Sequence, residues 1–165
     1  MIVPFHTLLG VVALVSGAWN LLATKGTRRH RTVGWVYTGS MAGLIGTSFL
    51  TYEMFDGFGP FHWMAIVSGA TLAPAIYFPL RRTHHANWLE HHYMWITYSY
   101  VGLLMATGSH LFALGPPGWP GWAKSLLYWG APYVIGSALI FGFRRRLLAR
   151  FQPADAEAAP ERNPV

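Results

Sequence analysis

The sequence predicts an all-α integral membrane protein, built as a bundle of five transmembrane helices. The first observation is composition: 53% of the 165 residues are hydrophobic and only 11% are charged, against about 25% charged residues in a soluble domain. The second is that apolar residues gather in five long stretches, and the third is that basic residues separate these stretches. A chain with so little charge cannot cover a water-facing surface. We therefore expect a multi-pass protein of the bacterial inner membrane, surrounded by the lipid bilayer.

Each of the five stretches has the length of about 20 mostly apolar residues that a helix needs to cross a bilayer. They are residues 3–23, 33–52, 61–80, 93–114 and 123–143. The connections are short, so neighbouring helices are expected to pack antiparallel. We assign residues 1–150 to one transmembrane domain and residues 151–165 to a disordered tail, because the segment from Pro153 has the composition of an unfolded chain.

Loop charges predict the orientation of the bundle. Lys124 is the single basic residue expected on one side, together with Glu53 and Asp56. Because basic loops stay in the cytoplasm, the N-terminus is expected outside and the C-terminus in the cytoplasm. The same bias accounts for a pI near 10.0, so we expect no nucleic-acid partner. The opposite side has ten basic residues: Lys25, Arg28, Arg29, Arg31, Arg81, Arg82, Arg144, Arg145, Arg146 and Arg150.

Small and polar residues form a stripe along one face of each of the first two predicted helices. A face of small residues lets helix backbones approach closely in lipid, where no hydrophobic force joins the helices. Thr27 is expected to cap the second helix, and Pro74 and Pro132 are expected to kink their spans. Asn20 is then a buried polar group that needs a partner on another helix. The first stripe is His6, Gly10, Ala13, Gly17 and Asn20, and the second is Gly39, Gly43 and Gly46.

Eight histidines are the chemically informative excess, and the topology sorts them into two layers. Each layer draws on several helices, which is how a bundle builds a metal or cofactor site. The outer layer contains His6, His62 and His110, and the inner layer contains His30, His84, His85, His91 and His92.

Three interpretations of the outer layer stay open. In the first, His6, His62 and His110 bind a transition metal (Zn, Cu or Fe) with one position open, and Glu53 and Asp56 assist. In the second, a single haem b lies between His6 or His62 and His110. A pair of haems is disfavoured, since His92 and His110 are 18 residues apart, about 27 Å along a helix axis. In the third, the histidines are amphipathic side chains at a bilayer boundary, and those of the inner layer contact lipid phosphates alongside Arg81 and Arg82.

The segment from Thr27 to Tyr37 carries a second candidate site. On a helix His30, Gly34 and Tyr37 share one face. In one interpretation His30 and Arg31 hold an anionic group, such as a quinone head, a propionate or a lipid phosphate. In the other, the arginines only determine topology and His30 is merely their neighbour. We name His30, Arg31 and His92 as candidate cofactor-binding residues.

Three motifs follow one another along the chain: His6-x-x-x-Gly10 with Gly17, then His30-Arg31-x-x-Gly34-x-x-Tyr37, then His92-x-Met94-Trp95 with Ser99-Tyr100. In this order they resemble a bacterial family of polytopic membrane proteins, domain-of-unknown-function family 2306, from the first span to the fourth. The resemblance implies the architecture and the importance of His6, His30, Arg31 and His92, but no reaction. The family has a basic residue a few positions after the Met-Trp pair of the last motif. This chain has Thr97 or Tyr98 at that place, so no cationic role is assigned there.

Two function classes follow. One is an inner-membrane protein with a histidine-lined metal or haem site near the outer face and a redox or hydrolytic role. The other is a non-catalytic accessory subunit of a larger respiratory or photosynthetic membrane complex, or of a homo-oligomer. The lack of Cys excludes disulfides, iron–sulfur clusters and thiol nucleophiles. No acid lies within a span, which argues against an ion-coupled transporter.

Overall fold

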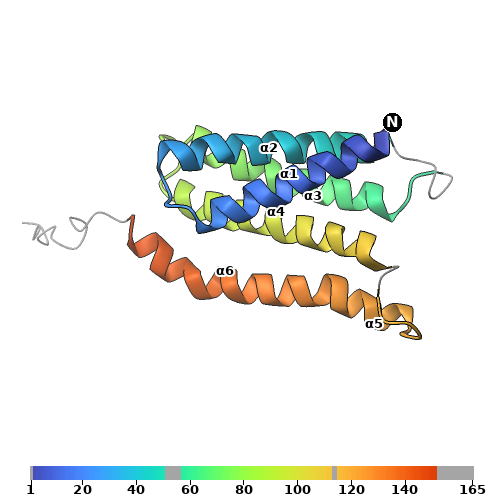
Figure 1. Ribbon diagram of the computed structural model, residues 1–165. Coiled ribbons are helices and arrows are strands. Elements are labelled where there is room, and N and C mark those ends of the chain that lie inside the picture. Colours follow the sequence, from blue (N-terminus) through green and yellow to red (C-terminus); the bar gives the residue numbers. More distant parts are fainter. Residues whose placement is uncertain (1, 51–56, 113–114, 152–165) are drawn as a thin grey trace, which may run out of the picture.

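The computed structural model describes residues 2–50, 57–112 and 115–151, and all regular structure in these ranges is helical. The all-α prediction is therefore confirmed. Glu53, Asp56 and the tail assigned to residues 151–165, apart from Phe151, lie outside the described residues. Along the chain the helices are α1 (Ile2–Leu22), α2 (Arg28–Ser48), α3 (Pro60–Leu80), α4 (Trp88–Leu111), α5 (Gly121–Ser125), the π-helical η2 (Leu126–Gly130) and α6 (Ala131–Ala149) (Figure 1).

Three helical segments are long and apolar enough to cross a membrane: Ile2–Leu22, Phe61–Leu80 and Gly121–Ala149. They indicate an integral membrane protein. The helices α2 and α4 have similar lengths, 21 and 24 residues, but they are more polar. Arginines open α2, and Glu90 with two histidines stands in the first turns of α4. Five spans are therefore not established by composition.

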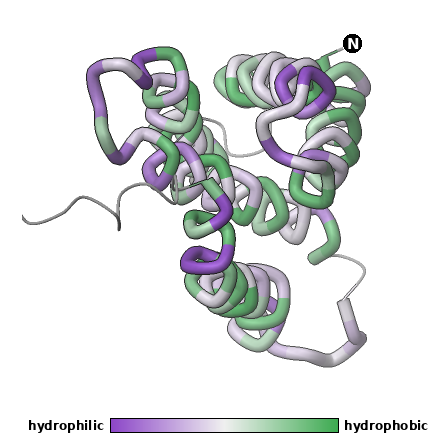
Figure 2. The backbone as a smooth tube through the Cα atoms, turned by 90° about the vertical axis from the view of Figure 1, so that its left-hand side faces the viewer, coloured by the Kyte–Doolittle hydropathy of each residue, from purple (hydrophilic) through white to green (hydrophobic). Residues whose placement is uncertain are grey.

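Helix α4 occupies the centre of the bundle and contacts α1, α3 and α6. The pairs α1–α2 and α3–α4 pack as hairpins, whereas α6 packs on α4 at the edge (Figures 1 and 2). The buried core is formed by Ala13, Tyr37, Met41, Leu72 and Leu103, which come from the first four helices. The central position of α4 allows its two ends to share sites with different neighbours.

Glycines permit the closest helix contacts. A Cβ on Gly17 would lie 2.5 Å from the Tyr100 ring, and one on Gly43 would lie 2.9 Å from Leu9. The first small-residue stripe therefore packs as expected. The second does so only at Gly43, because Gly39 and Gly46 are exposed and a Cβ there would meet nothing within 4 Å.

Local signals place the helix ends. The Thr27 hydroxyl accepts a hydrogen bond from the His30 backbone N–H at 3.1 Å, which is the expected N-cap of α2. Both Pro74 and Pro79 lie inside α3, and the π-helical turn η2 comes directly before the segment that contains Pro132.

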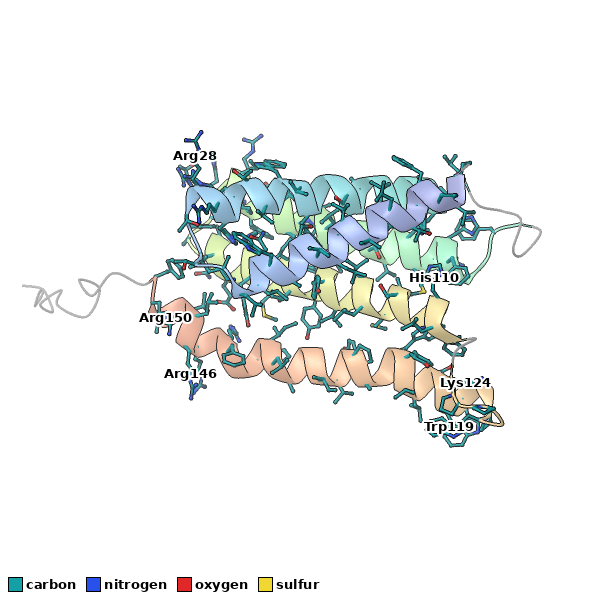
Figure 3. The ribbon with its side chains drawn as sticks, in the orientation of Figure 1. Arg28, His110, Trp119, Lys124, Arg146 and Arg150 are labelled. Atoms are coloured by element: carbon teal, nitrogen blue, oxygen red, sulfur yellow. The ribbon has the colours of Figure 1, made fainter. Side chains whose placement is uncertain are left out.

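The two ends of the bundle differ in charge. Arg28, Arg146 and Arg150 lie at one end, and His110 and Lys124 lie at the opposite end (Figure 3). We refer to these as the basic end and the His110 end.

Candidate functional site

At the His110 end, His6 is held by a hydroxyl of α2. Its Nδ1 lies 2.8 Å from Thr47 Oγ1, and that hydroxyl donates to the Gly43 carbonyl at 2.8 Å. A hydroxyl has one proton, so Thr47 accepts from the His6 Nδ1–H. The lone pair of His6 is therefore on Nε2. A metal-binding histidine commonly has this arrangement, because a partner on the other ring nitrogen fixes its tautomer.

His110 of α4 faces this ring. The centroids of the His6 and His110 rings are 6.4 Å apart, with 57° between the ring planes. Two imidazoles that bind one ion through nitrogen at about 2.0–2.1 Å place their centroids roughly 5–6.5 Å apart. The pair therefore has a separation that suits two ligands of one metal. The Phe61 ring lies nearly parallel to His110, at a centroid distance of 6.4 Å.

His62, the third expected ligand, binds the backbone at the start of α3 through its ring. Its side chain is 1% exposed, its Nδ1 accepts from the Gly59 N–H at 3.0 Å, and its ring stacks on Phe58 at 4.8 Å. Among the described residues, no group of three or more His, Cys, Asp or Glu side chains is placed to hold a metal ion. The expected three-histidine metal site is therefore not supported, because the Nδ1 of His62 is turned to a helix start.

At the basic end, a proline of α3 creates a partner for His92. Pro79 has no N–H, so the carbonyl of Ala75 four residues earlier lacks its helical donor. His92 of α4 forms the missing hydrogen bond to this carbonyl, with its Nδ1 2.7 Å from the Ala75 oxygen. A carbonyl can only accept, so His92 is protonated on Nδ1. A neutral His92 then has its lone pair on Nε2.

Helix α1 fixes His30 in the opposite tautomer. The Asn20 amide is satisfied in the orientation in which its nitrogen donates to His30 Nδ1 at 3.1 Å and its oxygen accepts from the Gly34 N–H at 3.1 Å. The ring proton of His30 is therefore on Nε2. His30 and His92 each lie seven residues, about two helical turns, before Tyr37 and Ser99, whose side chains share a hydrogen bond. Because α2 and α4 both run from the basic end toward the His110 end, the two imidazoles lie at the same level on the facing sides of these helices. The pair thus combines one N–H donor with one nitrogen acceptor.

Lys25 caps the C-terminal end of α1, next to Asn20. Its Nζ donates to the carbonyls of Asn20 at 2.5 Å and Leu21 at 2.8 Å, which lack helical donors at a C-terminus. Burial lowers the pKa of Lys25 from its ordinary value. The ammonium also lies within electrostatic range of His30. The site is therefore one in which a protonated imidazole would be disfavoured by a neighbouring cation.

Deeper in the bundle, hydroxyl groups join the same helices. Tyr37 of α2 and Ser99 of α4 share a buried hydrogen bond of 2.9 Å. The Tyr100 hydroxyl donates to the Leu14 carbonyl at 3.2 Å, beside Gly17. Residues of all three motifs in the sequence thus meet where α1, α2 and α4 come together.

The other candidates at the basic end lie apart from the pair. Arg31 is exposed. His85 lies 3.5 Å from the Tyr77 hydroxyl, and His91 stacks on Phe78 with a centroid distance of 4.4 Å. His84 is exposed, and its Nδ1 lies 3.1 Å from the hydroxyl of its neighbour Thr83.

Sequence reasoning missed Lys25 and the Ala75 carbonyl as parts of this site. Pro79 was the available signal, because a proline inside a helix always frees the carbonyl four residues before it.

Comparison of the chain with protein-family models, curated proteins and solved structures finds no match. The resemblance to family 2306 therefore stays an expectation.

Proposed function

We propose that the chain is a five-span inner-membrane protein that binds a transition metal, as a bare ion or as haem iron, between His6 and His110. The basic end faces the cytoplasm, as the positive-inside rule requires. The five-span arrangement is supported by the position of α2 and α4, which run beside the three apolar helices over comparable lengths (Figure 1). The metal site then lies near the outer face.

The observation that carries this proposal is the 6.4 Å centroid distance between two imidazoles from α1 and α4, with the tautomer of His6 fixed by Thr47. Neutral imidazole nitrogen is a ligand that Zn, Cu and Fe accept readily. Two protein ligands leave further coordination positions for water, substrate or a porphyrin. Such a centre supports redox or hydrolytic chemistry.

The test is elemental analysis and an absorption spectrum through the Soret region on the purified full chain. We expect near-stoichiometric metal or haem, and its loss in His6→Ala and His110→Ala. His84→Ala is the matched control and retains the metal. His62→Ala separates the two-ligand site from a three-ligand one, because it lowers thermal stability without removing the metal. A folded, colourless and metal-free wild-type protein contradicts the proposal.

A second candidate function, an accessory subunit, is favoured by the outer face of α2. Gly39 and Gly46 are exposed on this helix, and a Cβ on either would meet no other described residue within 4 Å. A small-residue face directed at lipid is suited to another membrane helix. If α2 docks on a subunit, Gly39→Leu changes the assembly size on a native gel, whereas Gly102→Leu on α4 is a control at an interior helix.

A further inference from the structure

We propose that His30 and His92 form a second site, which binds the hydroxyl group of a quinol head at the cytoplasmic end of the bundle. The site is separate from the metal pair, since His92 and His110 stand at opposite ends of α4. It is built by the side chains of Asn20, His30 and His92 and by the backbone of Ala75. Three helices therefore deliver the polar side chains, and a fourth supplies the carbonyl.

The tautomers decide what the site can bind. Asn20 leaves His30 with an Nε2–H donor, and the Ala75 carbonyl leaves a neutral His92 with an Nε2 acceptor. A ligand oxygen that uses both must accept one hydrogen bond and donate another. A hydroxyl group does so. A carboxylate, a phosphate or a quinone carbonyl can only accept, so its oxygen would meet the lone pair of His92 without a proton between them.

The position of the site favours a lipid-soluble ligand. His30 lies two residues after Arg28, which marks the basic end of the bundle (Figure 3). Beside Asn20, the last turns of α1 expose the apolar side chains of Trp19 and Leu22, which are 42% and 90% exposed. A ligand that approaches from the bilayer passes apolar surface before it meets the imidazoles. A quinol has an apolar tail and a ring hydroxyl at the depth of the membrane boundary, and it meets both conditions.

The geometry also predicts a preference between redox states. A quinol makes two hydrogen bonds to the pair, and the corresponding quinone makes one. A single hydrogen bond of this kind changes an equilibrium constant by roughly 2-fold to 12-fold. We therefore expect decylubiquinol to bind about 5-fold more tightly than decylubiquinone. The dimethyl ether of decylubiquinol, which keeps the ring and the tail but has no hydroxyl proton, should bind as weakly as the quinone.

The experiment is calorimetric titration of the purified full chain with these three probes. The quinol is titrated anaerobically in the presence of a reductant, and the quinone and the ether are titrated without one. His92→Asn is the decisive variant, because its amide still donates to the Ala75 carbonyl but has no Nε2 acceptor. It should lose the preference for quinol and keep quinone binding. His30→Asn should weaken all three probes, and His84→Ala should change none of them.

Three results would overturn the proposal: no saturable binding of decylubiquinol to the wild type, equal affinities for the quinol and its dimethyl ether, or an unchanged preference in His92→Asn. If His92→Asn fails to fold, the comparison of quinol with its ether on the wild type still decides the question. The metal proposal is judged on His6 and His110, so the two can fail independently.

Discussion

The substitution Gly108→Ala tests the packing that fixes the C-terminal part of α4. A Cβ on Gly108 would lie 2.5 Å from the Tyr128 carbonyl oxygen and 3.0 Å from the Tyr128 Cβ. Because the first of these atoms belongs to the backbone of η2, a side-chain rotation cannot relieve the overlap. The helix α4 or the π-helical turn must move instead.

Gly102→Ala on the same helix is the matched control, since a Cβ there meets nothing within 4 Å. Each substitution gains about 1 kcal/mol from the higher helix propensity of Ala. The overlap at Gly108 costs about 3 kcal/mol, the upper end of the usual range for overpacking, because backbone must shift. The net effect is about 2 kcal/mol of destabilisation for Gly108→Ala and about 1 kcal/mol of stabilisation for Gly102→Ala.

Thermal unfolding in detergent, followed by circular dichroism, measures both. At about 2–4 °C per kcal/mol for a chain of this size, the Tm falls by roughly 4–8 °C in Gly108→Ala and rises by roughly 2–4 °C in Gly102→Ala. If both variants raise the Tm by the same amount, the close approach of α4 and η2 is refuted. A fall in both would instead mean that α4 tolerates no side chain at either position.

Three further predictions concern single contacts and are measured by the same unfolding assay. Tyr37→Phe removes the buried hydrogen bond to Ser99 and should cost about 1 kcal/mol, whereas the double variant with Ser99→Ala should cost little more. Thr27→Ala removes the N-cap of α2 and should cost about 1 kcal/mol, most of which Thr27→Ser should restore. Glu90→Gln breaks the partly exposed pair with Arg144 and should cost less than about 1 kcal/mol, with the difference from wild type vanishing in 1 M salt.

Helix positions were predictable because they depend on local signals. The apolar stretches, the basic clusters between them and the Thr27 cap each act within a few residues, and every predicted span overlaps a helix. The bounds differ, however, because α2 and α4 each begin five residues before the apolar stretches predicted from residues 33 and 93. The three apolar segments follow from composition alone. The polar helices α2 and α4 show the limit of that argument, because their place in a membrane depends on the neighbours that cover their polar faces.

The direction of a side chain was not predictable from its depth. His62 lies in the first turn of α3, at the expected end of its span, but its Nδ1 accepts from the Gly59 N–H because the start of α3 leaves that donor without a helical acceptor. Likewise His92 binds a carbonyl that exists as a free acceptor only because Pro79 is four residues away. Both outcomes depend on backbone groups. Pro79 signals the free carbonyl of Ala75, but residue spacing does not reveal which side chain reaches it.

The two histidine pairs make α4 the element on which both proposed sites depend. His110 faces His6 of α1 at one end, and His92 lies at the level of His30 of α2 at the other, with about 27 Å of helix between His92 and His110. Each pair joins α4 to a different helix of the α1–α2 hairpin. A movement of α4 relative to that hairpin therefore changes both imidazole separations together, whereas a shift confined to one end changes one. Gly108→Ala acts two residues from His110, so it should weaken metal binding and leave the quinol preference intact.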